Sequence, residues 1–141
     1  MSQETTAVEV RVRYAETDQM GVAHHSHYLV WCEVARTDHM RRRGVTYLEI
    51  EEGGLRLAVV DASVRFRQPA RYDDLLSVRC WVREVASRRV VFGYAIDRPA
   101  DGALVATAQT ALIALDAGLR LGSIPDLVRS RLAVVPDPVR L

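Results

Sequence analysis

The sequence predicts one α+β domain in which an antiparallel five-stranded sheet wraps round a single long helix. The pattern of apolar residues indicates one strand, then the helix, then four more strands. The segments between those four strands are short, which favours antiparallel neighbours. The first half of the helix is apolar on nearly every side, so we expect the sheet to enclose it. With 141 residues the chain has the length of one domain with its own core, residues 1–141.

The first strand and the helix follow from local patterns. Residues 8–14 alternate between apolar and polar side chains, which is typical of a half-exposed strand. A loop over residues 15–27 leads into a helix from about Ser26 to Arg43. Basic residues in its last turn complement the helix dipole, and Gly44 suits the left-handed conformation that ends many helices.

The remaining elements are mostly strands. Alternating patterns predict four of them, over residues 55–68, 75–84, 88–97 and 103–115. In the first of these strands the even-numbered residues from Ala58 to Phe66 form one apolar face. The last two are joined by a turn at residues 98–102. A short helix is expected within residues 123–132, because Pro125 suits a first helical position.

Composition excludes several classes of protein. The net charge of +1 argues against nucleic acid as the main partner. All 19 basic residues are arginine, so no lysine Schiff base is possible. No apolar run reaches the roughly 18 residues of a membrane span, and the N-terminus lacks signal-peptide features. Cys32 and Cys80 lie in apolar stretches, which predicts buried free thiols and a cytoplasmic location.

The segment just before the helix carries the most chemistry. It places a carboxylate at Asp18, a glycine turn at Gly21, and an imidazole at His25 where the helix starts. A helix start presents unpaired backbone N–H groups and the positive end of the helix dipole. An acid beside such donors can attack a carbonyl, or activate water to do so, while the donors hold the oxyanion. The pattern therefore predicts a site for acyl chemistry, with Gly21 supplying the positive φ that aims Asp18.

This motif resembles a known family. It reads Tyr14-x-Glu-Thr-Asp18-x-x-Gly21-Val-x-x-His25-x-x-Tyr28, followed in the helix by Glu33-x-Ala-Arg36. It is similar to hotdog-fold acyl-CoA thioesterases, in particular the branch with 4-hydroxybenzoyl-CoA thioesterase and the Tol–Pal-associated thioesterases. The resemblance implies a hotdog fold and a homo-oligomer, either a dimer joined edge to edge or a tetramer. It also implies that no cofactor is needed, since CoA arrives as part of the substrate.

The resemblance assigns roles to four residues. Asp18 would act as nucleophile or general base, and the backbone N–H of His25 would polarise the thioester carbonyl. Arg88, with Arg89 beside it, would help to hold the phosphates of CoA. The predicted function is hydrolysis of acyl-CoA to acid and CoA, with an acyl-carrier-protein thioester as the other possible substrate. A hotdog hydratase or dehydratase, and a non-catalytic acyl-CoA-binding module, are the alternatives.

Four further residues are candidates from their positions alone. Tyr28 and Trp31 share one face of the helix and line either the core or an acyl pocket. Asp61 interrupts an apolar strand face, so it reaches the substrate or the rim of a dimer. Glu33 is expected to pair with Arg36 three residues later.

A metal site is not predicted from the three neighbouring histidines. His24, His25 and His27 lack a partnering Cys or Glu at ligand spacing, and adjacent side chains on a turn rarely converge on one ion.

Overall fold

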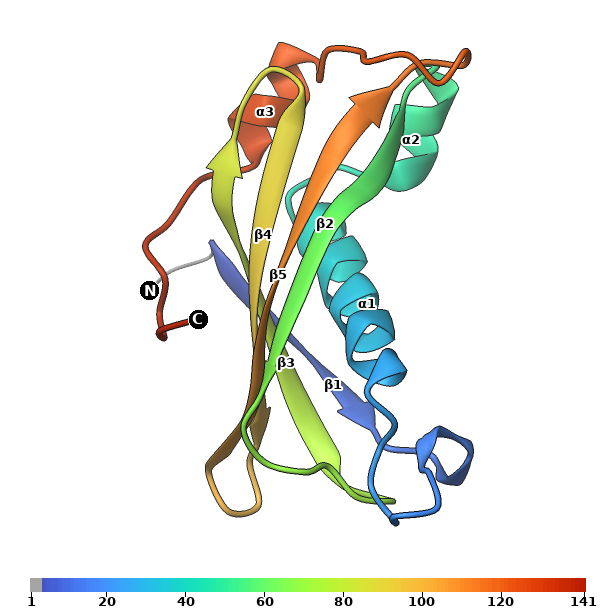
Figure 1. Cartoon of the computed structure of the whole chain (residues 1–141). Coiled ribbons are helices and arrows are strands. Elements are labelled where there is room, and N and C mark those ends of the chain that lie inside the picture. The colour runs from blue at the N-terminus through green and yellow to red at the C-terminus, as the bar shows by residue number, and fades with distance from the viewer. Residues whose placement is uncertain (1–3) are drawn as a thin grey trace.

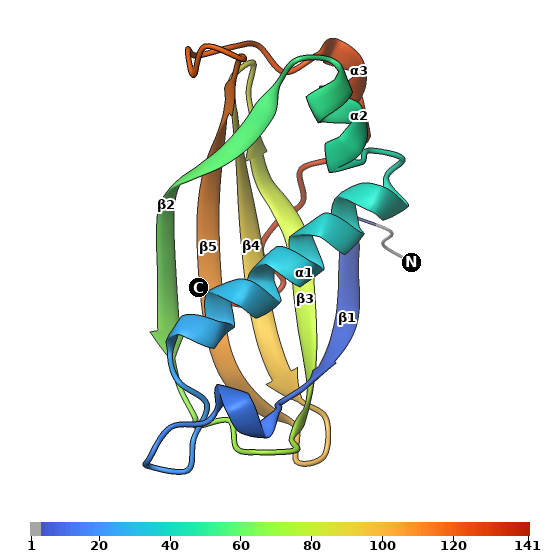
Figure 2. The ribbon, with the colours of Figure 1, turned by 90° about the vertical axis from the view of Figure 1, so that its right-hand side faces the viewer.

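The computed structural model describes residues 4–141 as a five-stranded antiparallel sheet curved round one long helix, α1 (Ser26–Arg42). The sheet order is β1-β3-β4-β5-β2, as Figures 1 and 2 show. The strands are β1 (Thr5–Arg11), β2 (Arg56–Phe66), β3 (Leu75–Val85), β4 (Arg89–Arg98) and β5 (Ala103–Leu115). This architecture confirms the predicted α+β fold.

The core lies between α1 and the concave face of the sheet. The even-numbered residues of the three central strands point toward the helix and are buried there, among them Val78, Phe92 and Leu112. Cys32 from α1 and Cys80 from β3 join this core as free, buried thiols, as the sequence predicted. Burial raises the pKa of the Cys32 thiol to about 12, so it stays protonated and unreactive.

Strand β2 does not keep the single apolar face that its sequence suggested. A β-bulge between Val59 and Asp61 leaves Val60 without a partner on β5. The side of the strand that faces the core therefore changes from odd to even residues: Leu57 packs on the core before the bulge, and Val64 packs on it afterwards. The prediction of one apolar face along the whole strand was wrong, because the extra residue in the bulge exchanges the two faces.

Three other boundaries differ from the sequence-based expectation. Tyr14 does not end the first strand but begins a short 3-10 helix, η1 (Tyr14–Glu16), and is 76% exposed. A helix that was not predicted, α2 (Tyr47–Glu52), starts where Thr46 accepts the Glu49 amide hydrogen. The C-terminal helix α3 (Asp126–Arg131) is shorter than its predicted segment.

Apolar side chains on β2 and on α1 are exposed to solvent in one protomer. Strand β2 is an edge strand, and Val59, Val60 and Phe66 are about half exposed. On α1, Val30 and Val34 are also about half exposed, so the helix is less enclosed than expected. None of the helices within residues 4–141 is long and apolar enough to cross a membrane.

The opposite face of the sheet is covered by the C-terminal tail, residues 133–141, which Figure 1 shows on the side away from α1. Trp81 is fully buried on this face and donates its indole N–H to Asp137 of the tail at 2.9 Å. Gly93 allows the indole to pack, because a Cβ at that position would lie 2.6 Å from it. The central strands β3, β4 and β5 are thus largely buried on both faces, whereas β2 is mostly exposed.

Candidate active site

The loop before α1 is a tight hairpin built round Gly21. The Asp18 amide donates to the Val22 carbonyl, and the Gly21 amide donates to the Asp18 carbonyl, both at 2.9 Å. Gly21 has a φ of +79°, the left-handed conformation that the sequence analysis assigned to it. The hairpin therefore fixes Asp18 directly opposite Val22.

The Asp18 carboxylate is half-buried and caps its own turn. Its Oδ1 accepts the Met20 amide hydrogen at 2.9 Å, which is a common arrangement for Asp in turns. Its Oδ2 has no hydrogen bond within residues 4–141. One carboxylate oxygen thus positions the side chain, and the other is available for chemistry.

The His25 amide is a free donor at the start of α1. The neighbouring amides are occupied: Ala23 donates to the Ala70 carbonyl at 2.7 Å, and His24 donates to the Glu16 carbonyl at 2.8 Å. In the part of the chain that the structure describes, no acceptor lies opposite the His25 N–H. This donor sits at the positive end of a 17-residue helix, where it favours a negative charge.

His25 lines an open pocket of about 320 Å³. The other lining residues are mostly apolar: Val22, Ala23, Tyr28, Phe66, Arg67, Gln68 and Pro69. Tyr28 packs its ring edge-to-face on Phe66 with 4.9 Å between centroids. Burial raises the pKa of Tyr28, so its hydroxyl is neutral. The pocket has a size that suits a small ligand, and its walls are mostly apolar.

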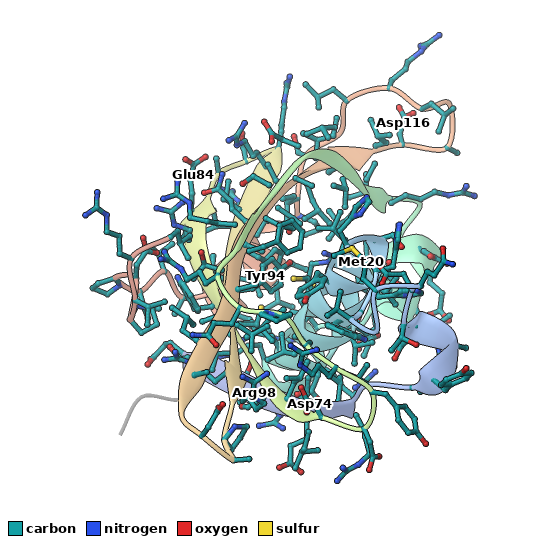
Figure 3. All side chains as sticks on the ribbon, turned by 60° about the horizontal axis from the view of Figure 1, so that its bottom comes forward. Met20, Asp74, Glu84, Tyr94, Arg98 and Asp116 are labelled. Atoms are coloured by element: carbon teal, nitrogen blue, oxygen red, sulfur yellow. The ribbon has the colours of Figure 1, made fainter. Side chains whose placement is uncertain are left out.

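The segment between β2 and β3 forms the far wall of this pocket. Arg98 holds that segment by donating to the Pro69 carbonyl at 3.0 Å and to the Asp74 carboxylate at 3.2 Å. Figure 3 shows Arg98 and Asp74 close together at this end of the molecule. Val22 also forms an isolated bridge with Arg71. The wall is therefore tied both to the sheet and to the hairpin that carries Asp18.

Glu16 belongs to this region and was not singled out from the sequence. Its side chain is 4% exposed, and it accepts hydrogen bonds from the Arg13 amide and the Trp31 indole. Burial alone would raise the pKa of Glu16, but these bonds together lower it, so the carboxylate is ionised. Glu16 belongs to the motif, but its partner Trp31 lies fifteen residues away, so the motif did not reveal this contact.

The other candidate residues, Asp18 included, do not line the pocket in one protomer. Trp31 is buried, but its indole faces Glu16 rather than the pocket. Asp61 pairs with Ala111, so it lies on the sheet face opposite α1. Arg88 lies in the β3–β4 turn and Arg89 begins β4, at the far end of the sheet from Asp18 (Figure 1). Arg89 pairs with Glu84 at 3.4 Å.

The expected pair of Glu33 and Arg36 is present, but the buried member is the arginine and not the glutamate. Glu33 is 70% exposed and lies 3.9 Å from the guanidinium. Arg36 is the buried member, and its nearer partners are the Tyr47 hydroxyl at 3.0 Å and the Tyr94 hydroxyl at 3.1 Å. The sequence suggested a buried acid that needs a cation, and the structure instead has a buried cation held by phenols.

The histidines form a stacked surface group. The rings of His24 and His25 lie 4.1 Å apart, and His24 accepts the Ser26 amide hydrogen at 3.3 Å. Across the described residues, no group of three or more potential ligands is arranged to hold a metal ion.

The fold and the pocket define a class: a hotdog domain with a free amide at the start of its central helix. A family model, described as the thioesterase-like superfamily, matches residues 12–140. A putative acyl-CoA thioesterase of Bacillus subtilis, YneP, is 39% identical over 108 residues, which cover 77% of this chain and 78% of that protein. The chain therefore belongs to the thioesterase-like superfamily and is a thioester hydrolase.

Solved structures agree with this membership. A DHNA-CoA thioesterase from Staphylococcus aureus is 33% identical, with a TM-score of 0.80 over 85% of this chain and 79% of that one. A mutant of 4-hydroxybenzoyl-CoA thioesterase in complex with 4-hydroxybenzoyl-CoA has a TM-score of 0.82 over 92% of this chain and 99% of that one. At 19% identity, the second likeness concerns the fold alone.

Proposed function

We propose that the protein hydrolyses acyl-CoA thioesters to the free acid and CoA, using Asp18 and the His25 amide. The observation that carries the proposal is that His25, whose backbone N–H has no partner within the described residues, lines a mostly apolar pocket. A preorganised donor of this kind is typical of sites that stabilise an oxyanion. The names of the B. subtilis and S. aureus proteins support CoA as the carrier of the acyl group.

The reaction follows from these positions. The thioester carbonyl enters the pocket with its oxygen toward the His25 N–H. Either the Asp18 carboxylate, or a water molecule that gives its proton to Asp18, adds to the carbonyl carbon. The carbonyl oxygen becomes an oxyanion that the amide holds. The C–S bond then breaks, and CoA leaves as a thiolate that takes up a proton.

Both routes consume one water molecule. Direct attack by Asp18 gives an acyl anhydride, which a water molecule opens to release the acid and restore the carboxylate. Attack by water gives the acid without that intermediate. In both cases the free Oδ2 of Asp18 is the group that reacts, and the bond from Met20 to Oδ1 orients it.

We further propose a homodimer joined through the edge strand β2. The half-exposed Val59, Val60 and Phe66 on that edge, together with Val30 and Val34 on α1, are apolar surface that a second copy would cover. The tail over the opposite sheet face favours a dimer over a tetramer built back to back, because that assembly would meet the tail. If the β2 strands of two copies pair antiparallel, the ends of the second sheet are exchanged relative to those of the first. Arg88 of the partner subunit would then lie at the same end as this pocket, where it would bind CoA phosphate.

A thiol-release assay over short, long and aromatic acyl-CoAs tests the function. We expect release of free CoA with at least one acyl class, and equal amounts of acid. An enoyl-CoA substrate separates the alternatives, since a hydratase would remove the conjugated thioester absorbance without releasing thiol. Tight acyl-CoA binding with no thiol release from any substrate would instead identify a binding module and contradict the proposal.

A further inference from the structure

Glu16 connects the two halves of the proposed site. Its Oε1 accepts the Arg13 amide hydrogen at 2.7 Å, and its Oε2 accepts the Trp31 indole hydrogen at 3.2 Å. Its main-chain carbonyl accepts the His24 amide hydrogen at 2.8 Å. Glu16, the last residue of η1, is therefore bonded to Arg13 before η1, to His24 before α1 and to Trp31 within α1.

The spacing along the chain gives these bonds their importance. Glu16 precedes Asp18 by two residues, and His24 directly precedes His25. Around the helix, His25 and Tyr28 line the pocket, whereas Trp31 points to Glu16. The Glu16 contacts thus lie immediately behind the pocket wall, on the side away from the substrate.

We infer that Glu16 is a positioning residue, whose buried carboxylate sets the distance and orientation of Asp18 relative to the His25 amide. This inference rests on the proposed hydrolysis. A displacement of about 1 Å between reacting groups can lower a rate about a hundredfold, so a residue that never touches substrate can control turnover.

The hydrogen bonds at Glu16 require two acceptor oxygens. The Arg13 amide donates to Oε1, whereas the Trp31 indole and, at 3.4 Å, the Arg13 guanidinium donate to Oε2. Glutamine has nearly the same shape, but one of its two terminal groups is itself a donor. In Glu16→Gln, the NH2 group must face either the Arg13 amide or the Trp31 indole, and two donors repel each other there.

The test measures kcat, KM and the melting temperature of four variants with the best acyl-CoA substrate. We expect Glu16→Gln to lower kcat about 10- to 100-fold, to change KM less than about threefold, and to remain folded at the assay temperature. The double variant Glu16→Gln/Trp31→Phe should recover part of the lost kcat, because the repelling indole N–H is gone. Glu33→Gln changes an exposed acid on α1; it is the control and should have the kcat and KM of the wild type.

Asp18→Asn is run in parallel so that the two proposals fail separately. If Asp18→Asn loses activity but Glu16→Gln keeps the wild-type kcat, the positioning role is wrong and the proposed function stands. The positioning role is also wrong if the loss in Glu16→Gln equals its unfolded fraction, or if the double variant recovers nothing. If both Asp18→Asn and Glu16→Gln keep full activity, the role of Asp18 in the proposed reaction is contradicted, and the positioning role with it.

Discussion

The two halves of α1 use polar groups in opposite ways. At its first turn, the His25 amide has no protein acceptor within the described residues, and His25 lines an open pocket. In its second half, Arg36 and His39 are buried, and both bind core hydroxyls: Arg36 binds tyrosines, and His39 Nδ1 lies 2.7 Å from the Thr6 hydroxyl. Unpaired groups that reach open space can react with a ligand, whereas groups that are buried and paired act through the structure that they hold in place.

The largest effect that follows from this contrast is expected at Asp18. In Asp18→Asn the turn keeps its acceptor for the Met20 amide, but the nucleophile or base is lost. Turnover should fall by about a hundredfold or more, with an unchanged melting temperature. Thiol-release kinetics and thermal unfolding measure the two quantities. Activity within a few-fold of the wild type would remove Asp18 from the reaction.

A smaller effect, on stability alone, is expected at His39. Burial, followed by the nearby Arg43 charge, lowers the pKa of His39 from 6.5 to about 4. The unfolded chain takes up a proton at this residue below about pH 6.5, and the folded protein does so only near pH 4. The free energy of unfolding is therefore not reduced by His39 above pH 6.5. It decreases as the pH falls toward 4, by about 3 kcal/mol in total.

Comparison with His39→Gln isolates that contribution. Chemical denaturation at a series of pH values should give a shallower loss of unfolding free energy below pH 6.5 for the variant. Acid sensitivity equal to that of the wild type would mean that His39 is not the group responsible.

The smallest effect is expected at Gly21. An alanine there meets no atom within 4 Å but must adopt a φ of +79°, at a cost of about 1 kcal/mol. Gly102→Ala is a matched control, because Gly102 has a φ of +70° and equally open surroundings in the β4–β5 turn. Both variants should lose similar stability in urea titrations, and only Gly21→Ala should lose activity, by several-fold. Equal activity of the two variants would mean that the hairpin does not need to hold Asp18 rigidly.

Local sequence signals predicted the parts of the molecule that depend on neighbours in the chain. The start of α1 and the glycine turn are read from a few adjacent residues, and both are present in the structure. Helix α2 also had such a signal: Thr46, followed three residues later by Glu49, is the pattern of a capping box. The sequence-based prediction of helices did not include it. The bulge in β2 had a weaker signal: the odd positions stop being apolar at Asp61, while the even positions stay apolar as far as Phe66.

Non-local features could not be predicted in the same way. Glu16 is recognisable only when Trp31 is known to lie beside it, and Arg36 only when Tyr94 is. Arg88 follows the family pattern along the chain, but sheet topology puts its turn at the far end of the protomer. The predicted cytoplasmic location and the absence of a cofactor remain predictions.

A pair of variants at one position tests the central claim most directly. His25→Ala removes the imidazole and keeps the backbone N–H. His25→Pro removes the N–H itself, and the native φ of −56° suits proline. We predict that thiol release by His25→Ala stays within a few-fold of the wild type, while His25→Pro, still folded, loses about a hundredfold or more. Full activity of a folded His25→Pro enzyme would contradict the assignment of the amide as oxyanion donor.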